Sequence, residues 1–402
     1  MGTEGGGSSD STGMPGAMAV FLPALSLGGA ERVMIELGLG LVEVGVPVDL
    51  VVGQVRHDTT APDGMRLVNL GRNRMGSCIL PLRGYLRDAR PTALLTTLFH
   101  ANLCAVVAWE LAGRPCRLIL REASPPSQIR AKSGRVWGVI GKHGLPLLYN
   151  RADGVIAVSR DIADELAGLG VRGRNVHTIL NPRTSRLSID RAPNKSVVPE
   201  HWLATSREMP LVVAAGRLET VKGFGTLLEA FRRLLIRRPA RLVIFGEGTE
   251  RNVLEALVLR LGLTDSVCLA GATANLAQIL ETADAFVLSS VREGCPNVLI
   301  DALSAGTPIV ATDCSSSVDD ILDAGRLGSI VPVGDESALA AALEEALTRP
   351  VDGTLLRARS EDFRMEVILP QYLSLLRGGE PPNPSNGGIC GDPGDSGVGR
   401  IV

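Results

Sequence analysis

The sequence predicts an α/β protein of two doubly wound parallel-sheet domains that face each other across a cleft. Short apolar runs alternate with longer amphipathic stretches in each half of the chain. This alternation lapses over residues 183–208, a polar stretch that suits a connection between domains. Aromatic side chains make up 3 % of the chain, so aliphatic residues must fill the core, as in parallel strands covered by helices on both faces.

Each expected element follows from the alternation. In the first half, strands are expected at 19–25, 47–53, 93–98, 117–120 and 154–159, with helices at 29–44 and 101–112. In the second half, strands are expected at 210–216, 241–246, 266–271, 285–290 and 308–313, with helices at 224–238, 249–262, 275–283, 297–305 and 336–347.

The predicted domains are residues 17–182 and 209–355, joined by the connection at 183–208. A final helix at 356–377 is expected to pack back toward the first domain. Residues 1–16 are Gly/Ser-rich and residues 378–402 are Gly/Pro-rich, so both ends are predicted to be disordered.

Composition limits the classes of function. The 402 residues carry 41 basic and 43 acidic side chains, a formal charge of −2, which argues against a nucleic-acid-binding protein. Seven scattered cysteines without a CxxC pair predict free thiols in a reducing compartment. No apolar run reaches the roughly 18–20 residues that span a bilayer, and the N-terminus lacks the features of a signal peptide. We therefore expect a cytoplasmic protein.

Two loops at predicted strand ends are candidate phosphate sites, because doubly wound sheets bind ligands beyond the carboxyl ends of their strands. Gly28 and Gly29 precede a helix, where paired glycines let the backbone approach an anion; a simple turn would need them equally. Arg217 and Lys222 follow the first strand of the second half, where they can meet a diphosphate or remain solvated surface cations.

A third loop is the most informative. Glu293 follows a predicted strand, and Asp301 lies about one turn inside the helix after it, so two carboxylates border one pocket. They can grip vicinal hydroxyls, as in a sugar or ribose; alternatively, Glu293 complements a helix dipole and Asp301 is solvated. Unpaired N–H groups of the helix start would face the cleft. The residues of this turn and helix start are Gly294, Cys295, Pro296, Asn297 and Val298.

At these motifs the chain resembles the retaining glycosyltransferases of GT-B fold, the glycosyl transferases group 1 family (family four). The segments that carry the resemblance are GGAERV, GRLETVKG, FGEGTERNVLEAL, SSVREGCPNVLIDALSAGTPIVATD and RADGVIAVS followed by LNP. The resemblance spans residues 18–375 and is most specific in the second half. It implies two Rossmann-like domains, the first holding the acceptor and the second a nucleotide-sugar donor. It also implies transfer with retention, without a metal or other cofactor.

The resemblance assigns a role to each phosphate-loop residue. Arg217 and Lys222 match the pair that neutralises the donor diphosphate. Gly28 and Gly29 match the loop that approaches the phosphates from the other domain.

It also assigns roles to the two acids and to a histidine. Glu293 matches the first acid of the family's E-x7-E motif, which holds a hydroxyl of the donor sugar. The second acid, which holds the ribose, falls on Asp301, a departure that implies a weaker or shifted ribose contact. His100, in LFHANL, matches the family's cleft histidine beside the transferred sugar, or is a helix-start or packing residue.

The expected activity is transfer of a sugar to a glycan or lipid-linked acceptor in the assembly of a surface polysaccharide or oligosaccharide. Two alternatives stay open at this point: a nucleotide-sugar epimerase or hydrolase of similar fold, and a catalytically silent protein that binds a sugar nucleotide.

Residues 123–152 contain no acidic side chain but five cations, interleaved with apolar residues such as Trp137 and Ile140. Such a segment predicts peripheral contact with an anionic membrane at its inner face, or with a lipid diphosphate. The alternative is a solvated loop followed by an ordinary packed helix. The cations are Arg130, Lys132, Arg135, Lys142 and Arg151.

Overall fold

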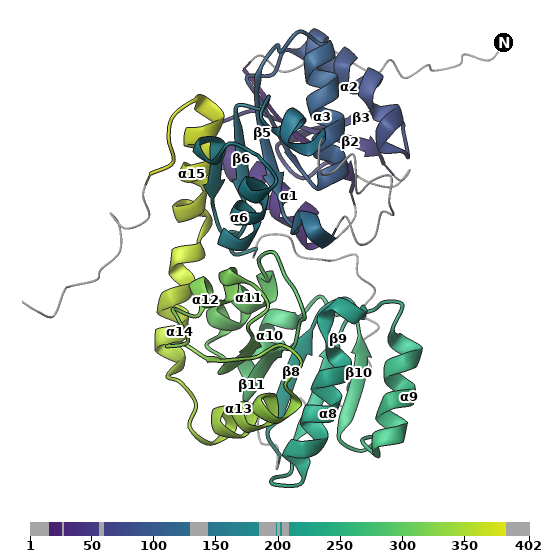
Figure 1. Cartoon of the computed structure of the whole chain (residues 1–402), viewed down its shortest axis with the longest axis vertical. Coiled ribbons are helices and arrows are strands. Elements are labelled where there is room, and N and C mark those ends of the chain that lie inside the picture. The colour runs from purple at the N-terminus through teal and green to yellow at the C-terminus, as the bar shows by residue number, and fades with distance from the viewer. Residues whose placement is uncertain are drawn as a thin grey trace, which may run out of the picture.

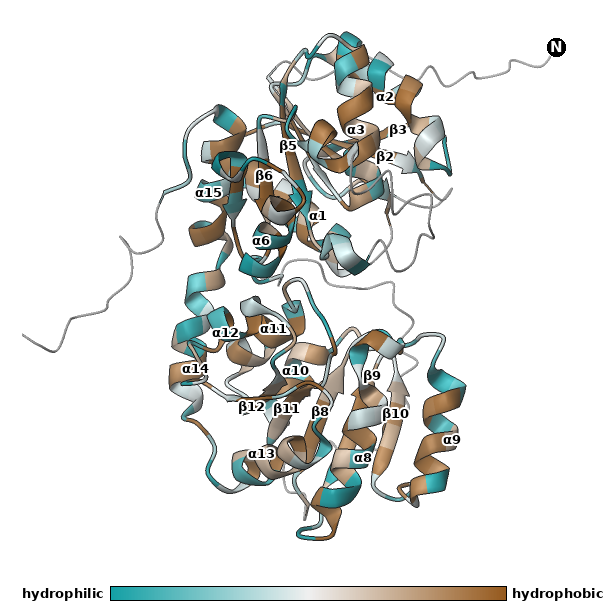
Figure 2. Cartoon of the chain, in the orientation of Figure 1, coloured by the Kyte–Doolittle hydropathy of each residue, from teal (hydrophilic) through white to brown (hydrophobic). Residues whose placement is uncertain are grey.

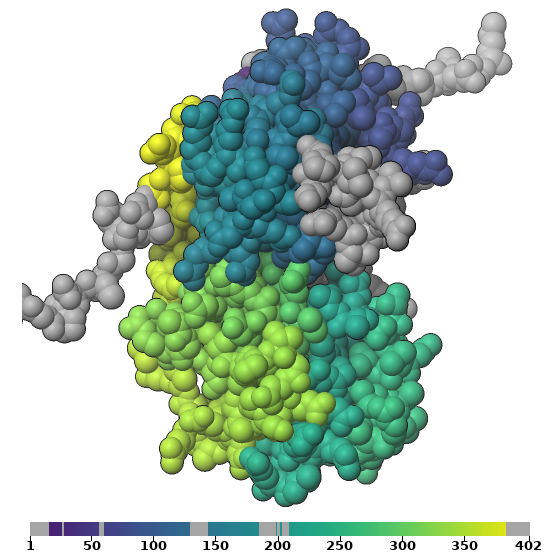
Figure 3. Space-filling view, viewed as in Figure 1, coloured from purple at the N-terminus to yellow at the C-terminus, as the bar shows by residue number. Residues whose placement is uncertain are grey.

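The computed structural model describes residues 16–25, 28–55, 60–128, 144–184, 198, 202 and 209–382. They form two parallel α/β domains stacked along the long axis of the molecule, as the alternation predicts (Figure 1). The first sheet has seven strands in the order β3-β2-β1-β4-β5-β6-β7, and the second has six in the order β10-β9-β8-β11-β12-β13. In the space-filling view the two domains are in close contact (Figure 3).

The first domain contains every predicted strand and helix of the first half, together with elements that the alternation missed. Its strands are β1 (Met18–Ala24), β2 (Val48–Gln54), β3 (Met65–Asn69), β4 (Ala93–Thr97), β5 (Arg117–Glu122), β6 (Gly154–Ala157) and β7 (Val176–Thr178). Its helices are α1 (Gly29–Glu43), α2 (Met75–Ala89), α3 (Phe99–Leu111), α6 (Arg160–Gly168) and the 3-10 turn η1 (Gly173–Asn175). Helix α2 escaped prediction because Pro81 and two glycines interrupt its apolar pattern.

The second domain likewise contains all its predicted elements. Its strands are β8 (Leu211–Ala215), β9 (Arg241–Phe245), β10 (Val267–Gly271), β11 (Ala285–Leu288), β12 (Ile309–Thr312) and β13 (Ser329–Val331). Its helices are α8 (Phe224–Leu235), α9 (Arg251–Leu261), α10 (Leu276–Thr282), α11 (Asn297–Ala305), α12 (Ser316–Ile321), α13 (Glu336–Thr348) and α14 (Gly353–Ser360), with 3-10 turns η2 (Thr220–Lys222) and η3 (Glu361–Phe363).

The last helix, α15 (Met365–Arg377), leaves the second domain and packs against the first. Met365 and Leu369 belong to the same buried cluster as Met18 of β1 and Met34 of α1. In Figure 2, α15 shows apolar bands alternating with hydrophilic ones, which is typical of a helix with one buried face. The chain therefore ties its C-terminal segment to the N-terminal sheet, and the two domains are linked at two places.

Buried aliphatic side chains fill both faces of each sheet. Within the described part of the chain, no helix is both long enough and apolar enough to cross a bilayer. The basic segment lies largely outside the described residues, because residues 129–143 are not among them. Most of the connection at 183–208 and of the two predicted disordered ends also lies outside them.

Candidate active site

An ion pair is held at the loop ends of the second sheet. After β11 the chain turns through Ser290 and Glu293 before α11 begins. Oε1 of Glu293 accepts hydrogen bonds from Nζ of Lys222 and from Oγ of Ser290, both at 2.6 Å. The Lys222 and Glu293 side chains are only 17 % and 13 % exposed, so little water screens their attraction. The structure thus brings together two residues that the sequence predicts in separate loops, and adds Ser290 to them.

Glycines let these loops approach so closely. Gly223, which follows Lys222, has a φ of +64°, and a Cβ there would overlap the carbonyl oxygen of Ser289. At Gly294, a Cβ would overlap the carbonyl oxygen of Ala123 in the first domain. Gly294 therefore allows the turn before α11 to lie directly against the first domain.

Arg217 forms an ion pair with a different acid. Its Nη1 is 2.6 Å from Oε1 of Glu219, and its side chain is 68 % exposed. The sequence predicts Arg217 and Lys222 as one diphosphate-binding pair. The structure places both after β8, but it is Lys222 that contacts Glu293.

The glycine loop of the first domain meets α11 of the second. Gly28 caps α1 and Gly29 is its first residue. Nδ2 of Asn297, the first residue of α11, donates a hydrogen bond to the carbonyl oxygen of Gly29 at 3.3 Å. The N-terminal ends of α1 and α11 therefore lie side by side. Each end carries a positive partial charge, so together they favour an anion.

The remaining residues of the turn before α11 are held by contacts with Asn181 and with the core of the second domain. Nδ2 of Asn181 donates to the carbonyl oxygen of Cys295 at 3.2 Å and to Oδ1 of Asn297 at 2.6 Å. Burial raises the pKa of the Cys295 thiol to about 12, so this thiol stays protonated and is a poor nucleophile. Pro296 caps α11, and Val298 packs against the core of the second domain.

Asp301 lies on α11 where that helix faces α1. Burial raises the pKa of its carboxyl group to about 6; the charges of Arg32 and Arg183 oppose this rise, and that of Glu36 adds to it. Arg32 and Glu36 both belong to α1. Asp301 is thus surrounded by charges of the first domain and the connection, which a solvated helix acid would not be.

His100 lies in the first turn of α3 and is exposed. The protein atoms around its imidazole lower its pKa, while the Glu31 carboxylate of α1 partly opposes this, so the ring is neutral at pH 7. Leu98, which lies two residues before His100 and caps α3, has a φ of +74°, a strained conformation for a bulky side chain. The influence of Glu31 places His100 close to the start of α1.

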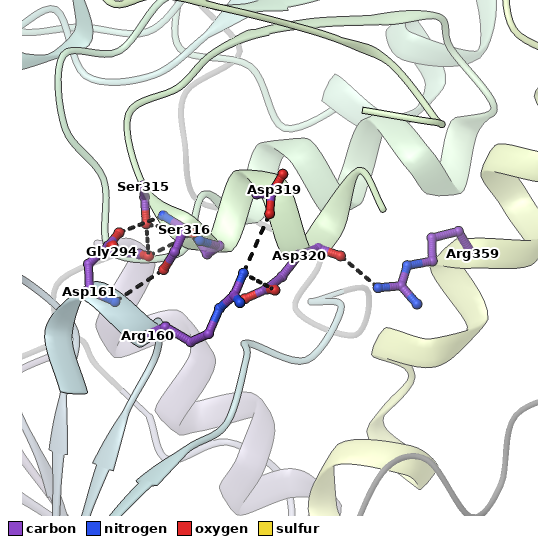
Figure 4. Close-up of polar contacts among 9 residues, drawn as sticks. Arg160, Asp161, Gly294, Ser315, Ser316, Asp319, Asp320 and Arg359 are labelled. Carbon is purple, nitrogen blue, oxygen red and sulfur yellow. Dashed lines mark hydrogen bonds and ion pairs between the residues drawn. The ribbon is translucent and has the colours of Figure 1, made fainter. Parts of the chain in front are cut away.

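A cleft of about 1060 Å³ opens between the domains on one side of Glu293. The first domain lines it with Asp161 and Glu165, and the second with Arg292 and Ser315. At this cleft, Arg160 of the first domain forms ion pairs with Asp319 and Asp320 of the second, at 3.5 and 2.7 Å (Figure 4). The Glu293 loop is therefore open to the inter-domain space on this side.

Two features of the site were not anticipated from the sequence. Ser290 lies three residues before Glu293, just after β11. A hydroxyl group at that spacing from an acid is the sequence feature that indicates a hydrogen bond between the two side chains. Asn181 lies in the LNP segment, but only the fold reveals that it reaches α11. In the described ranges, no three His, Cys, Asp or Glu side chains lie close enough together to hold a metal ion.

Comparison with known proteins gives concordant family matches. Residues 27–183 match the model described as Glycosyltransferase Family 4, and residues 209–349 match the model described as Glycosyl transferases group 1. The chain is 29 % identical over 362 residues to the lipopolysaccharide core biosynthesis glycosyltransferase LpsE of Rhizobium meliloti (strain 1021), which covers 87 % of this chain and 96 % of the relative.

A second relative is the N-acetylgalactosamine-N,N'-diacetylbacillosaminyl-diphospho-undecaprenol 4-alpha-N-acetylgalactosaminyltransferase of Campylobacter jejuni. It is 23 % identical over 375 residues, or 90 % of this chain and 99 % of the relative. Among solved structures, the chain shares its fold with HepE of Anabaena in complex with UDP-glucose, at a TM-score of 0.70 and 18 % identity over 90 % of this chain and 99 % of that one.

Proposed function

Because this chain belongs to the glycosyl transferases group 1 family (family four) and has the GT-B fold, we propose that it moves a sugar from a nucleotide-sugar donor to a glycan or lipid-linked acceptor. We propose further that the anomeric configuration is retained. The names of the relatives, which concern a lipopolysaccharide core and a diphospho-undecaprenol glycan, support an acceptor of surface polysaccharide or oligosaccharide assembly.

The observation that carries this proposal is the Glu293 carboxylate held by Lys222 and Ser290 beside two helix N-termini from different domains. Breaking the anomeric C–O bond leaves negative charge on the departing diphosphate. Lys222, Arg217 and the N-terminal ends of α1 and α11 would stabilise that charge. In the described part of the chain, Lys222 and Ser290 both donate their hydrogen bonds to Oε1 of the Glu293 carboxylate. Its other oxygen, Oε2, would accept a hydrogen bond from a hydroxyl group of the donor sugar.

The acceptor's proton has a simple route in this scheme. The departing phosphate oxygen takes it as the acceptor oxygen attacks from the same face of the sugar, which accounts for retention. The protonated thiol of Cys295 supports a reaction without a cysteine nucleophile. We propose that no metal is needed, since Arg217, Lys222 and the helix ends supply the positive charge. His100, near the start of α1, would contact the transferred sugar, and Asp301 the ribose.

A donor panel tests the proposal. The full chain is incubated with labelled UDP-, GDP-, ADP- and dTDP-sugars, with undecaprenyl-linked and glycan acceptors, and with or without EDTA. Transfer that survives EDTA, with an unchanged anomeric configuration by NMR, is expected. Free sugar without transfer would indicate a hydrolase, a changed donor sugar an epimerase, and binding without turnover a catalytically silent protein. Loss of transfer with EDTA would overturn metal independence alone.

We also propose peripheral contact with the inner face of an anionic membrane. The support is the sequence of residues 123–152, whose five cations are not offset by any acid. An enzyme that uses a lipid-linked acceptor would gain from such contact, because it keeps the cleft near the membrane surface.

A further inference from the structure

We propose that Asn181 is a positioning residue that holds the N-terminal ends of α11 and α1 together through a hydrogen-bond relay starting at Arg121. This inference deepens the proposed function and rests on it for its catalytic meaning. The relay consists of hydrogen bonds that join the side chains of Arg121, Asn181 and Asn297 to the backbone carbonyl group of Gly29.

The relay begins at a buried cation. Arg121 lies on β5, and its side chain is fully buried. Its Nε donates to the hydroxyl of Tyr372 at 3.1 Å and its Nη1 to Oγ1 of Thr97 at 3.0 Å. Its Nη2 donates to Oδ1 of Asn181. The three side chains that accept these hydrogen bonds are all neutral.

The direction of every later hydrogen bond follows from this cation. A guanidinium group has donors and no acceptor, so Asn181 must turn its amide oxygen toward Arg121. Its Nδ2 is then left to donate to Oδ1 of Asn297 at 2.6 Å. Asn297 must in turn present its own Nδ2 to the carbonyl oxygen of Gly29 at 3.3 Å. One buried charge thus fixes the orientation of two amides in two domains.

The relay opposes a repulsion. The N-terminal ends of α1 and α11 both carry positive partial charge, so without a link they would move apart. The hydrogen bond from Asn297 to Gly29 joins them, and Asn181 orients Asn297 to make it. The two helix ends are then preorganised where the departing diphosphate gains its charge, and such preorganisation is worth more than contacts formed during the reaction.

Asn181→Asp separates positioning from folding. The carboxylate accepts from Arg121 as the amide does and gives this buried cation a counter-charge, so the variant is expected to fold. It cannot donate, however. If the Asn297 amide keeps its orientation, its Oδ1 faces the carboxylate at position 181; if it turns over, its Oδ1 faces the carbonyl oxygen of Gly29. In either case one of the two contacts that hold the helix ends together is lost.

Hydrogen exchange measures this link without any substrate. In Asn181→Asp, amides of residues 28–33, 295 and 297–300 are expected to exchange about tenfold faster than in the wild type, the effect of losing one hydrogen bond. The melting temperature should be unchanged or higher. Turnover of UDP-glucose should fall by about tenfold or more, while UDP affinity measured by calorimetry falls less. Asn252→Asp, at an exposed position of α9, is the matched control and should alter none of these.

The possible outcomes distinguish a failure of the relay proposal from a failure of the proposed transferase activity. Unchanged exchange in a folded Asn181→Asp protein overturns the relay, whatever the turnover. Faster exchange together with a wild type that turns over no donor supports the relay and overturns the proposed transferase. If Asn181→Asp does not fold, Asn297→Asp replaces it, because an acid suits the start of α11 and the contact with Gly29 is still lost. Unchanged exchange at 28–33 in that variant would also overturn the relay.

Discussion

Asp161 and Ser316 exchange hydrogen bonds across the domain interface (Figure 4). The backbone N–H of Asp161 donates to Oγ of Ser316 at 3.1 Å, and the backbone N–H of Ser316 donates to Oδ2 of Asp161 at 2.5 Å. Asp161 lies in the first turn of α6, and Ser316 is the first residue of α12. Each side chain therefore satisfies an N–H group that the other helix leaves unpaired at its start. Polar contacts between helix ends hold the domains together at this edge.

Asp161→Ala is expected to loosen this edge. Removing the carboxylate leaves the N–H of Ser316 without its acceptor, a loss of about 1 kcal/mol by analogy with helix caps. The melting temperature should fall by about 2–4 °C, and amide exchange at the start of α12 should accelerate. Asp164→Ala, at an exposed position of the same helix, is the control. Equal changes in the two variants would show that the Asp161–Ser316 exchange does not stabilise the interface.

Glu293→Gln should reduce kcat by about 10²- to 10³-fold, because the amide loses the charge that Lys222 and Ser290 hold in place at the sugar. Binding of the donor's nucleoside diphosphate should survive, since we place Glu293 at the sugar and not at the nucleotide. Steady-state kinetics and calorimetry measure the two effects.

The control for Glu293→Gln is Glu345→Gln, an exposed position on α13. It should leave both quantities unchanged. A loss of affinity for the donor's nucleoside diphosphate as large as the loss of kcat would remove Glu293 from the sugar subsite and assign it to the nucleotide.

Glu122→Gln tests a buried acid at the end of β5. The hydroxyl of Tyr149 donates to Oε2 of Glu122 at 2.6 Å, and burial raises the pKa of Glu122 to about 7 although the hydrogen bonds of Tyr149 and Asn102 oppose it. The folded protein thus holds this proton more tightly than the unfolded chain, whose value is near 4.5. The free energy of unfolding should fall as pH rises from about 4.5 to 7.

The variant has no such proton, so its unfolding free energy should depend less on pH. At pH 8 it should exceed that of the wild type by on the order of 1–2 kcal/mol. Urea denaturation at pH 6 and pH 8 measures this; Asp301, with a pKa of about 6, is present in both proteins, so the difference between them isolates Glu122. Parallel changes in the two proteins between these pH values would mean that Glu122 is charged throughout.

The sequence predicts the two sheets because buried parallel strands need continuous apolar runs, and these are visible without any tertiary information. It does not predict β3, which is short and only half-buried. The candidate loops were identified by their places at strand ends, but pairing Lys222 with Glu293 over 71 residues requires the packing of two loops. Asn181 and the surroundings of Asp301 depend on how the domains dock, which local pattern does not encode.

Asp301→Glu lengthens the acid at the position where family resemblance puts the ribose contact. We expect donor affinity to be kept or improved, because the longer side chain restores the family's reach. Its neighbours Arg32 and Arg183 supply positive charge for either acid. Calorimetry with the donor's nucleoside diphosphate measures the effect, and Asp301→Asn is the comparison that removes the charge. A loss of affinity above about tenfold, or 1.4 kcal/mol, in Asp301→Glu would show that this pocket fits aspartate alone.

The final prediction concerns the basic segment, most of which lies outside the described residues. Four of its cations are changed together to Gln in one variant: Arg130, Lys132, Arg135 and Lys142. Four exposed arginines elsewhere are changed in the control: Arg232, Arg260, Arg349 and Arg377.

The wild type should cosediment with anionic liposomes at low salt and be largely released near 0.5 M NaCl, because each cation contributes on the order of 1 kcal/mol and salt screens it. The segment variant should lose this binding and keep its affinity for the donor's nucleoside diphosphate, since we place the donor in the other domain. The control should bind liposomes as the wild type does. Equal losses in both variants would mean that overall charge and not this segment drives the contact. A wild type that stays in solution at low salt would favour a soluble glycan as the acceptor.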